Sequence, residues 1–414
     1  MKRTVWSLFF LLAAGLAALA SRAGAQNASQ LPQPPLNGYY TYGKLRGVTH
    51  EAAMHGVEAA TTVPMWSYTV TASRDDNVYS GVMIGRSPFF HGARTTNIPV
   101  VIIPVKFTMT DHESGAQVFD PTATDPTCSP NGAAVTVFQN SPILNAVDFT
   151  MPFSGGINVG SGQYTDEFQR ANFWSSVSVT GNRYHTTLSP VTTLPVQSVT
   201  VPSGDGKGYK SSDFGSGFCG NLGGLNGAWW DPVIFVGGSG GEAQTLISNL
   251  TTAGKISPTQ FPIFLFYNVI MNADDETPCE SGCALGYHNS QGDPVQTYGV
   301  ADWDTTKLFT GSGQTTGNSS VMSHEVAEWM NDPLGDNPVP SWGHIGQQPG
   351  CQDNLEVGDA LSGTIVPPVT LNSMSYDLQE LVFFSWFYGA PSIAVDSIFS
   401  DNDTFTTDAG AVCE

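Results

Sequence analysis

The sequence predicts an α+β fold in which most apolar stretches form short strands. Gly, Pro and Asn bound these stretches, and the 414-residue chain contains 45 Gly and 27 Pro. Residues 98–108 and 261–271 give the strongest strand signals, because both are long apolar runs rich in β-branched or aromatic side chains. Only 12% of the residues are charged, which is typical of a loop-rich extracellular protein with β-structure.

Residues 1–25 have the pattern of a secretory signal peptide. Lys2 and Arg3 precede an apolar stretch over residues 5–20, and a small-residue cleavage site (Ala-Gly-Ala) follows at residues 23–25. A membrane anchor is the alternative, but the apolar stretch is short and is interrupted by glycine. No other stretch reaches about 18 apolar residues, so we expect a secreted or extracytoplasmic protein without a membrane anchor.

After a leader over residues 26–60, residues 61–215 are expected to form a β-rich N-terminal region. Residues 65–72 alternate between apolar and polar as a strand does, and residues 77–84 are expected to pair with them. The strand over 98–108 contains Pro104, which favours an edge position or a bulge because proline has no N–H to donate. The later elements expected in this region are a helix over 163–174 and strands within 184–201.

In the helix over 163–174, Phe168 is expected to face the core, with Asp166 and Glu167 facing solvent. Residues 216–414 are expected to form a metal-binding region, although the two regions are equally compatible with one composite domain. The elements expected there are strands at 230–236, 261–271 and 296–303, and helices at 242–253 and 376–387.

Six cysteines follow the signal peptide, and an even number in a secreted chain predicts disulfide bonds. Cys279 and Cys283 form the local candidate pair. The expected remaining pairs are Cys351 with Cys413 and Cys128 with Cys219. A cysteine-based zinc site is the alternative, but no C-x2-C pair supports it.

The chain is strongly acidic, with a net charge of −21. Loss of the signal peptide removes three of the 15 basic residues and no acidic ones, which leaves 12 against 36 and a net charge of −24. Nucleic acids and anionic membrane surfaces are therefore excluded as expected partners.

Residues 323–333 (SHEVAEWMNDP) are the stretch with the clearest chemical potential, and they are expected to form a helix that ends at Pro333. His324 and Glu328 lie four residues apart and therefore share one face, and Glu325 lies about 100° round from His324. The candidate N-cap residues are Asn318, Ser319 and Ser320. The apolar side chains on roughly the opposite face are Met322, Val326, Trp329 and Met330.

This H-E-x-x-E helix resembles the H-E-x-x-H helix of zincin metallopeptidases, with Glu328 in place of the second histidine. Residues 355–359 (LEVGD) resemble the third-ligand segment of the gluzincin class, in which a Glu completes the site and an Asp orients the helix histidine. The S-H-E-x-A-E, D-P and E-V-G-D motifs together also resemble the exordium (phosphate-induced) family of secreted proteins, over about residues 265–390. The resemblance implies a zincin-like mixed sheet with an active-site helix, and an edge strand at 298–303.

The resemblance also implies a set of metal ligands. His324 and Glu328 are the expected ligands from the helix, unless they form only a surface pair. Glu356 is the expected third ligand, with Asp359 as the close alternative and His344 as a further one. One imidazole and two carboxylates favour zinc less strongly than two imidazoles do, so one divalent ion is expected, Zn²⁺ or else Mn²⁺ or Ca²⁺.

Two catalytic roles follow from the same resemblance. Glu325 is the expected general base, which activates water. His288 or Tyr287 is the expected proton donor to the oxyanion, unless the histidine is simply satisfied by the backbone. Residues 401–403 (DND) lack the Gly and Glu of a calcium loop and are expected to form a solvated turn. No role is assigned to His50, His55, His91, His112 and His185.

The sequence therefore predicts a secreted metal-dependent hydrolase, most directly a zinc peptidase acting on proteins or peptides. Two alternatives stay open. The first is a non-enzymatic extracellular or wall-associated protein with a structural metal site and a cell-surface ligand. The second is a degenerate zincin with neither metal nor activity.

Overall fold

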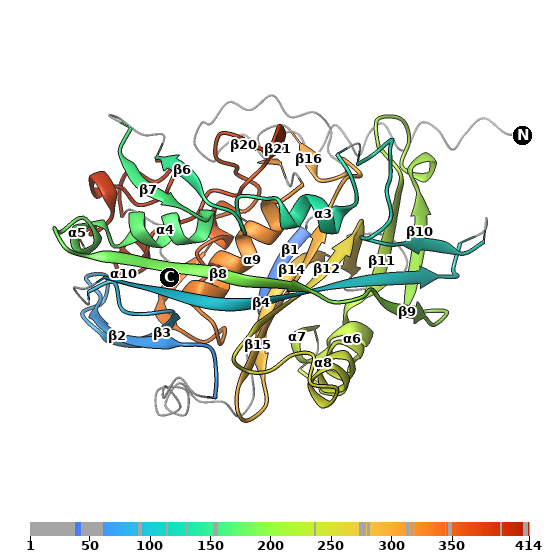
Figure 1. The fold of residues 1–414 in the computed structure, drawn as a ribbon, viewed down its shortest axis with the longest axis horizontal. Coiled ribbons are helices and arrows are strands. Elements are labelled where there is room, and N and C mark those ends of the chain that lie inside the picture. Colours follow the sequence, from blue (N-terminus) through green and yellow to red (C-terminus); the bar gives the residue numbers. More distant parts are fainter. Residues whose placement is uncertain are drawn as a thin grey trace, which may run out of the picture. The chain divides into compact units, whose positions relative to one another are not determined.

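The computed structural model describes most of the chain from residue 61 onward (Figure 1). The described residues are 38–42, 61–89, 93–112, 115–129, 131–151, 156–235, 237–272, 279, 282–311, 314–315, 318–343, 345–346, 350–389, 391–408 and 413. For 38–42, 93–94, 310–311 and 314–315, only the backbone is described. The expected signal peptide, most of the leader and His344 lie outside the described residues.

A large mixed sheet organises the α+β fold, in agreement with the predicted class. Its strand order is β10-β11-β13-β14-β15-β12-β4-β5, with β1 beside β14 and with β8 and β9 beside β4. The central strand β12 is parallel to β15 and β4, whereas β14 is antiparallel to β15. The strands are β1 (Gly38–Tyr42), β4 (Ala93–Met109), β5 (Gln117–Phe119), β8 (Arg183–Thr193), β9 (Gln197–Val201), β10 (Gly206–Lys210), β11 (Asn221–Asn226), β12 (Phe261–Tyr267), β13 (Val269–Asn272), β14 (Cys283–Gln291) and β15 (Gln296–Trp303).

Both predicted regions of the chain contribute to this sheet. Strands β4, β8 and β9 precede residue 216, and β12 to β15 follow it, yet β4 and β12 are hydrogen-bonded neighbours. Residues 33–414 form one compact unit. The sheet of the C-terminal half is therefore completed by strands from the N-terminal half.

The sheet separates two hydrophobic cores because its central strands are apolar on both faces. Along β4, Val100 and Ile102 lie in one core, while Val101 and Ile103 lie in the other. The first core contains α9 (Ser320–Asn331) and also α4 (Tyr164–Asn172) and α10 (Phe384–Tyr388). The second contains α6 (Gly227–Trp230) and α8 (Glu242–Thr252), beside α7 (Pro232–Phe235). Figure 1 shows the two sets of helices on opposite sides of β4.

Smaller elements surround this framework. The predicted pairing of residues 65–72 with 77–84 is confirmed as the hairpin of β2 (Met65–Thr71) and β3 (Val78–Ile84). The other two-stranded pairs are β6 (Val147–Thr150) with β7 (Asn158–Gly162), β16 (Thr310–Gly311) with β17 (Gln314–Thr315), β18 (Pro338–Gly343) with β19 (Cys351–Asn354), and β20 (Val369–Leu371) with β21 (Met374–Tyr376). The remaining helices are α3 (Ala134–Gln139) and α5 (Trp174–Val177), and the 3-10 turns are η1 (Ser211–Asp213), η2 (Asp359–Leu361) and η3 (Val395–Ser397).

Two strands lie inside the sheet, although an edge position was expected for one of them, and an edge position or a bulge for the other. Strand β4 pairs with β12 on one side and with β8 and then β9 on the other. Pro104 sits between the last pair with β8, Ile102–Thr193, and the first pair with β9, Val105–Gln197. The missing proline N–H therefore falls in a gap of the ladder. Strand β15 lies between β12 and β14, so the expectation of an edge strand at 298–303 was wrong.

Three expected elements differ from the structure for local reasons. Residues 230–236 were expected as a strand, but α6 and α7 lie there, and the Asp231 carboxylate accepts a hydrogen bond from the Val233 N–H at the start of α7. The apolar run 261–271 is split at Asn268, whose φ of 53° ends β12. Residues 374–376 form β21, so the last helix begins only at Phe384.

All three predicted disulfide pairs are confirmed. Cys279 is joined to Cys283, Cys128 to Cys219, and Cys351 to Cys413, and no cysteine is free. These bonds are typical of an oxidising compartment. Within the described residues, no helix combines the length and apolar character needed to span a membrane.

Candidate metal centre

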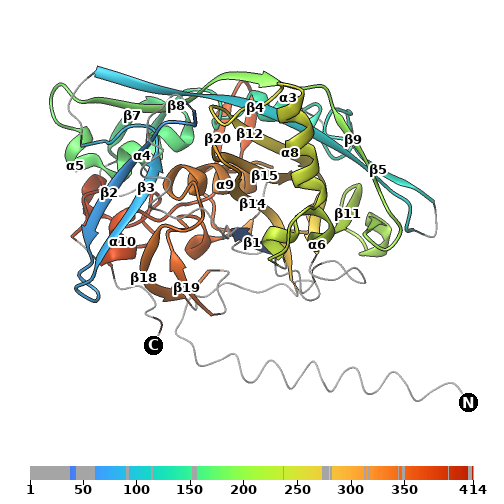
Figure 2. The same cartoon turned by 90° about the horizontal axis from the view of Figure 1, so that it is seen from below.

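Helix α9 positions the site because it packs against β14 and β15 on the inner face of the sheet (Figure 2). The helix spans residues 320–331, close to the expected bounds, and each of its side chains is buried. The indole of Trp329 stacks on Phe261 of β12, with ring centroids 3.6 Å apart. This packing fixes the rotation of the helix, so that His324, Glu325 and Glu328 have defined neighbours.

The first group of potential ligands joins α9 to the loop at 355–359. The His324 Nε2 atom lies 2.8 Å from Oε2 of Glu328 and 3.4 Å from Oδ1 of Asp359. The Gly358 N–H donates to Oε1 of Glu328 at 3.0 Å, and Gln352 Nε2 donates to Oδ2 of Asp359 at 3.0 Å. Both carboxylates are therefore oriented with one oxygen held and the other directed at the histidine.

Gly358 is required by this contact between loop and helix. A Cβ atom at position 358 would lie 2.4 Å from Nδ1 of His324, which is closer than any side chain could tolerate. The glycine of the E-V-G-D motif thus allows the loop to approach the helix histidine.

His288, from β14, faces the same oxygen of Glu328 as His324 does. Its Nε2 lies 2.9 Å from the Asp332 carbonyl oxygen, and because a carbonyl can only accept, Nε2 carries the hydrogen. The Nδ1 atom lies 3.7 Å from Oε2 of both Glu325 and Glu328. Burial lowers the pKa of His288 to about 3, aided by His324 and opposed by the Asp332 carbonyl. His288 is therefore neutral, with Nδ1 as the acceptor of the ring, and its expected role as proton donor to the oxyanion stays a prediction.

Glu325 is enclosed without a hydrogen-bond partner. Its side chain is 1% exposed, and neither of its carboxylate oxygens has a partner among the described residues. Burial raises its pKa well above the usual value, and the negative charges of Glu328 and Asp359 add to this while His324 opposes it. The carboxylate fits beside β14 only because position 286 is glycine, where a Cβ would lie 2.6 Å from Oε1.

Glu356 lies on the His288 side of the site and not beside His324. Its Oε2 atom is 4.0 Å from Nε2 of His288 and has no hydrogen-bond partner among the described residues. Burial raises its pKa well above the usual value, and repulsion from Glu328 contributes. Of the alternatives for the third ligand, Asp359 is the residue that the structure groups with His324 and Glu328, whereas His344 is outside the described residues.

The pKa values of the central pair follow from the same surroundings. Burial would lower the pKa of His324, but Glu328, Asp359 and Glu325 outweigh it and raise the pKa well above the usual value. Burial raises the pKa of Glu328, although the positive charge of His324 acts in the opposite direction. In the absence of a cation, this site therefore tends to retain protons.

The donor set can hold a divalent metal ion. Around α9, two groups each offer one ligand atom per residue within 4.8 Å of the others: His324, Glu328 and Asp359, and His288, Glu325 and Glu328. Imidazole nitrogen with carboxylate oxygen suits several divalent ions, so the groups do not select one metal. Tyr287, the alternative to His288, points to the opposite face of β14, where its hydroxyl donates to Asp231.

Sequence reasoning missed the residues that support the site. They are the Asp332 carbonyl, which holds His288, together with Gly286, Gln352 and Asn354, whose amide donates to Glu356. Gly286 was detectable in principle, because it lies two residues before His288 and therefore on the same face of the strand. The Asp332 carbonyl has no sequence signal.

A second group of ionisable residues lies on α4 and β8. His185 Nδ1 is 2.7 Å from Oδ2 of Asp166, and Arg170 Nε is 3.6 Å from Oε2 of Glu167. Asp166 and Glu167 were expected to face solvent, but both are 0% exposed. The reason is β7, whose Gly162 lies so close that a Cβ would be 2.4 Å from both carboxylates.

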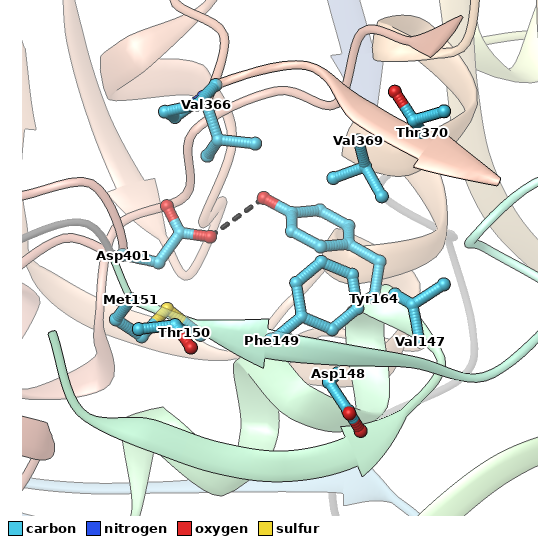
Figure 3. A pocket seen from close by; sticks show the side chains of 11 residues that line it. Val147, Asp148, Phe149, Thr150, Met151, Tyr164, Val366, Val369, Thr370 and Asp401 are labelled. Carbon is cyan, nitrogen blue, oxygen red and sulfur yellow. Dashed lines mark hydrogen bonds between the residues drawn. The ribbon is translucent and has the colours of Figure 1, made fainter. Parts of the chain in front are cut away.

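A pocket of about 470 Å³ lies between residues 147–151, Tyr164 of α4 and residues 366–370 (Figure 3). The Tyr164 hydroxyl points at Asp401, 2.7 Å from its Oδ2, and also donates to the Gln379 carbonyl. Gln379 in turn donates to the Gly358 carbonyl at 2.7 Å. Asp401 is buried here, so residues 401–403 are not simply a solvated turn. The pocket lining is Val147, Asp148, Phe149, Thr150, Met151, Tyr164, Val366, Pro367, Val369, Thr370 and Asp401.

No family model, curated protein or solved structure matches this chain. The resemblance to zincins and to the exordium family therefore stays a prediction from motifs. The function has to be inferred from the buried carboxylates and histidines themselves.

Proposed function

We propose that the chain is a secreted metal-dependent hydrolase, in its most direct form a zinc peptidase. The observation that carries the proposal is the position of Glu325. A buried carboxylate with no hydrogen-bond partner lies beside a group, His324, Glu328 and Asp359, that can bind a divalent ion. A buried group left unpaired in this way is costly for folding, so a functional reason is expected.

A divalent ion held by His324, Glu328 and Asp359 would supply Lewis-acid polarisation and would lower the pKa of water. Glu325 would accept one proton from the water molecule whose oxygen adds to the scissile carbonyl carbon. It would return that proton to the leaving nitrogen as the C–N bond breaks. Its raised pKa suits a group that must hold a proton between these two steps.

His288 would take a positioning role in this scheme. Its Nε2–H is committed to the Asp332 carbonyl, so the free Nδ1 would accept a hydrogen bond from the water or from a substrate N–H. Protein or peptide substrates are the class suggested by the motif resemblance. The acidic composition argues against nucleic acid as a substrate.

A structural metal site in a non-enzymatic extracellular protein is the second candidate function. One observation favours it: the six side chains of the site, His288, His324, Glu325, Glu328, Glu356 and Asp359, are each at most 2% exposed. A substrate can reach such a site only if part of the protein moves. A structural ion needs no such access.

The discriminating experiment compares wild-type protein with Glu325→Gln on an unstructured protein substrate, with Zn²⁺, Mn²⁺ or Ca²⁺ added in turn. Loss of a general base should reduce kcat by about 10²- to 10⁴-fold, while His324, Glu328 and Asp359 keep their ion. Glu242→Gln, at the start of α8, is the matched control and should behave as wild type. Equal cleavage by wild type and Glu325→Gln would exclude the base, and a wild type that binds metal but is inactive at every metal concentration would favour the structural site.

Secretion is part of the proposal and has its own test. The disulfides and the signal-like N-terminus predict a mature chain that begins at Gln26. N-terminal sequencing of protein exported by an expression host should find Gln26. Retention of Met1 would contradict this part of the proposal.

A further inference from the structure

The geometry points to a second metal position, formed by His288 Nδ1, Glu325 and Glu328 and sharing Glu328 with the first. This inference rests on the proposed metal centre and adds to it. It assigns the position to a divalent ion that accepts nitrogen and oxygen ligands, such as Zn²⁺ or Mn²⁺.

The first argument is the direction of the His288 lone pair. The Nε2–H is used by the Asp332 carbonyl at 2.9 Å, so Nδ1 must present a lone pair to what it faces. It faces the Oε2 atoms of Glu325 and Glu328, each at 3.7 Å. That separation is too long for a hydrogen bond. It is close to the spacing of about 3.4 Å between two ligands of a tetrahedral ion bound at about 2.1 Å.

The second argument is the support behind the histidine. Histidines that bind metals generally donate their other ring N–H to a carbonyl or carboxylate, which fixes the ring and the tautomer. His288 has such a partner in the Asp332 carbonyl, which immediately follows α9 in the chain. The helix that carries Glu325 and Glu328 therefore also fixes the orientation of the third ligand.

The third argument is the unsatisfied state of the ligands. His288 is 0% exposed and Glu325 is 1% exposed. Neither Nδ1 of His288 nor either oxygen of Glu325 has a hydrogen-bond partner among the described residues. Buried carboxylates are stable only when paired or bound to a cation, and an ion at this position would satisfy both residues.

The fourth argument distinguishes two ions from one. His324 and Asp359 form one group with Glu328, and His288 and Glu325 form another, with Glu328 as the shared member. The two groups contain three carboxylates, and Glu356 adds a fourth. When all four are ionised, their total charge is −4. Among the described residues, no Lys or Arg forms an ion pair with the three glutamates. Two divalent ions balance this charge, whereas one leaves −2.

Occupancy of the second position has a consequence for the proposed chemistry. A carboxylate bound to a divalent ion is a much weaker base, because the cation stabilises its anionic form, so Glu325 acts as an effective base only when the second position is empty. The first ion therefore supports hydrolysis and the second one stops it. Activity should rise and then fall as the metal concentration increases.

The test counts bound ions in the full-length mature protein. Metal-free protein is titrated calorimetrically with Zn²⁺, and bound metal is measured by mass spectrometry after gel filtration. Wild type should bind two ions per chain. His288→Ala and Glu325→Gln should each bind one ion per chain. The association constant for the second ion should fall by more than the roughly 10- to 100-fold that follows loss of a residue that only supports a ligand. The Glu325→Gln variant keeps the side-chain volume and covers the case in which His288→Ala does not fold.

His185→Ala is the matched control, because His185 belongs to the only other group of potential ligands among the described residues, with Asp166 and Glu167. It should still bind two ions. One ion in wild type, unchanged in His288→Ala, would overturn the second position and leave the first intact. Loss of the second ion in His185→Ala would assign it to α4, and no binding by wild type would overturn both positions.

Discussion

Two buried clusters in this molecule combine carboxylates of a helix with a histidine of a neighbouring strand. On α4, Asp166 and Glu167 lie beside His185 of β8. On α9, Glu325 and Glu328 lie beside His288 of β14. The residue types are the same, but the groups that offset the charge of the buried carboxylates differ between the two clusters.

The α4 cluster is neutralised by the protein. Arg170 lies 3.6 Å from Glu167, and Asp166 is bonded to His185 at 2.7 Å and to the Thr186 N–H at 2.6 Å. The guanidinium of Arg170 and the N–H groups of His185 and Thr186 therefore face the two buried carboxylates. Such a cluster has no need of a metal ion.

The α9 cluster has no corresponding arginine among the described residues. Of its two histidines, His288 is kept neutral by burial, so only His324 offers a positive charge to the carboxylates of the cluster when no metal is bound. Glu325 has no hydrogen-bond partner among the described residues. The comparison shows that composition alone does not identify a metal site. What separates the two clusters is whether the protein already supplies the opposite charge.

The largest effect is expected in the α4 cluster. Arg170→Met should lower the free energy of unfolding by about 3–5 kcal/mol, because it leaves Glu167 buried without its positive partner. Denaturant unfolding measures this. The exposed Arg183→Met is the control and should change stability by less than about 0.5 kcal/mol. A small loss in Arg170→Met would show that this cluster is not self-neutralised.

Metal removal should affect only the α9 cluster. An ion present at about 100 times its dissociation constant stabilises the folded state by about 2.7 kcal/mol. Chelator should therefore lower the melting temperature of wild type, and added Zn²⁺ should restore it. The shift should persist in His185→Ala and vanish in Glu328→Ala. If His185→Ala loses the chelator-induced shift in melting temperature, the metal ion is bound at the α4 cluster and the contrast between the two clusters is wrong.

The smallest effect concerns pH in the metal-free protein. The folded-state pKa of Glu325 is raised, so its contribution favours folding below the unfolded pKa of about 4.5 and is lost as pH rises towards the folded value. Glu325→Gln should remove this loss and should therefore be more stable than wild type at pH 7 but not at pH 4. Identical pH profiles for the two proteins would contradict the buried, unpaired carboxylate.

Local patterns predicted the parts of the site that lie within one element or one short motif. The four-residue spacing placed His324 and Glu328 together on α9. The E-V-G-D motif predicted that this segment supplies a carboxylate to the site, but Asp359, the alternative to the expected Glu356, is the residue beside His324. The cysteine positions predicted the disulfides.

What sequence could not supply depends on packing between distant elements. Asp166 and Glu167 of α4 were expected to face solvent, but β7 covers them and they are buried. Likewise, the Asp332 carbonyl reaches His288 only because α9 packs on β14. Every residue has a backbone carbonyl, so the residue types do not reveal which carbonyl accepts a hydrogen bond from His288. The tautomer of His288 could therefore not be predicted from the sequence.

The most direct test of the central claim is the location of the bound metal. Crystals of the mature protein grown with Zn²⁺ should show anomalous difference density at the zinc absorption edge, bonded to His324 Nε2, Glu328 and Asp359. The α4 cluster of Asp166, Glu167 and His185 should show none. Density only at the α4 cluster, or none at α9 with Zn²⁺ present, would contradict the account.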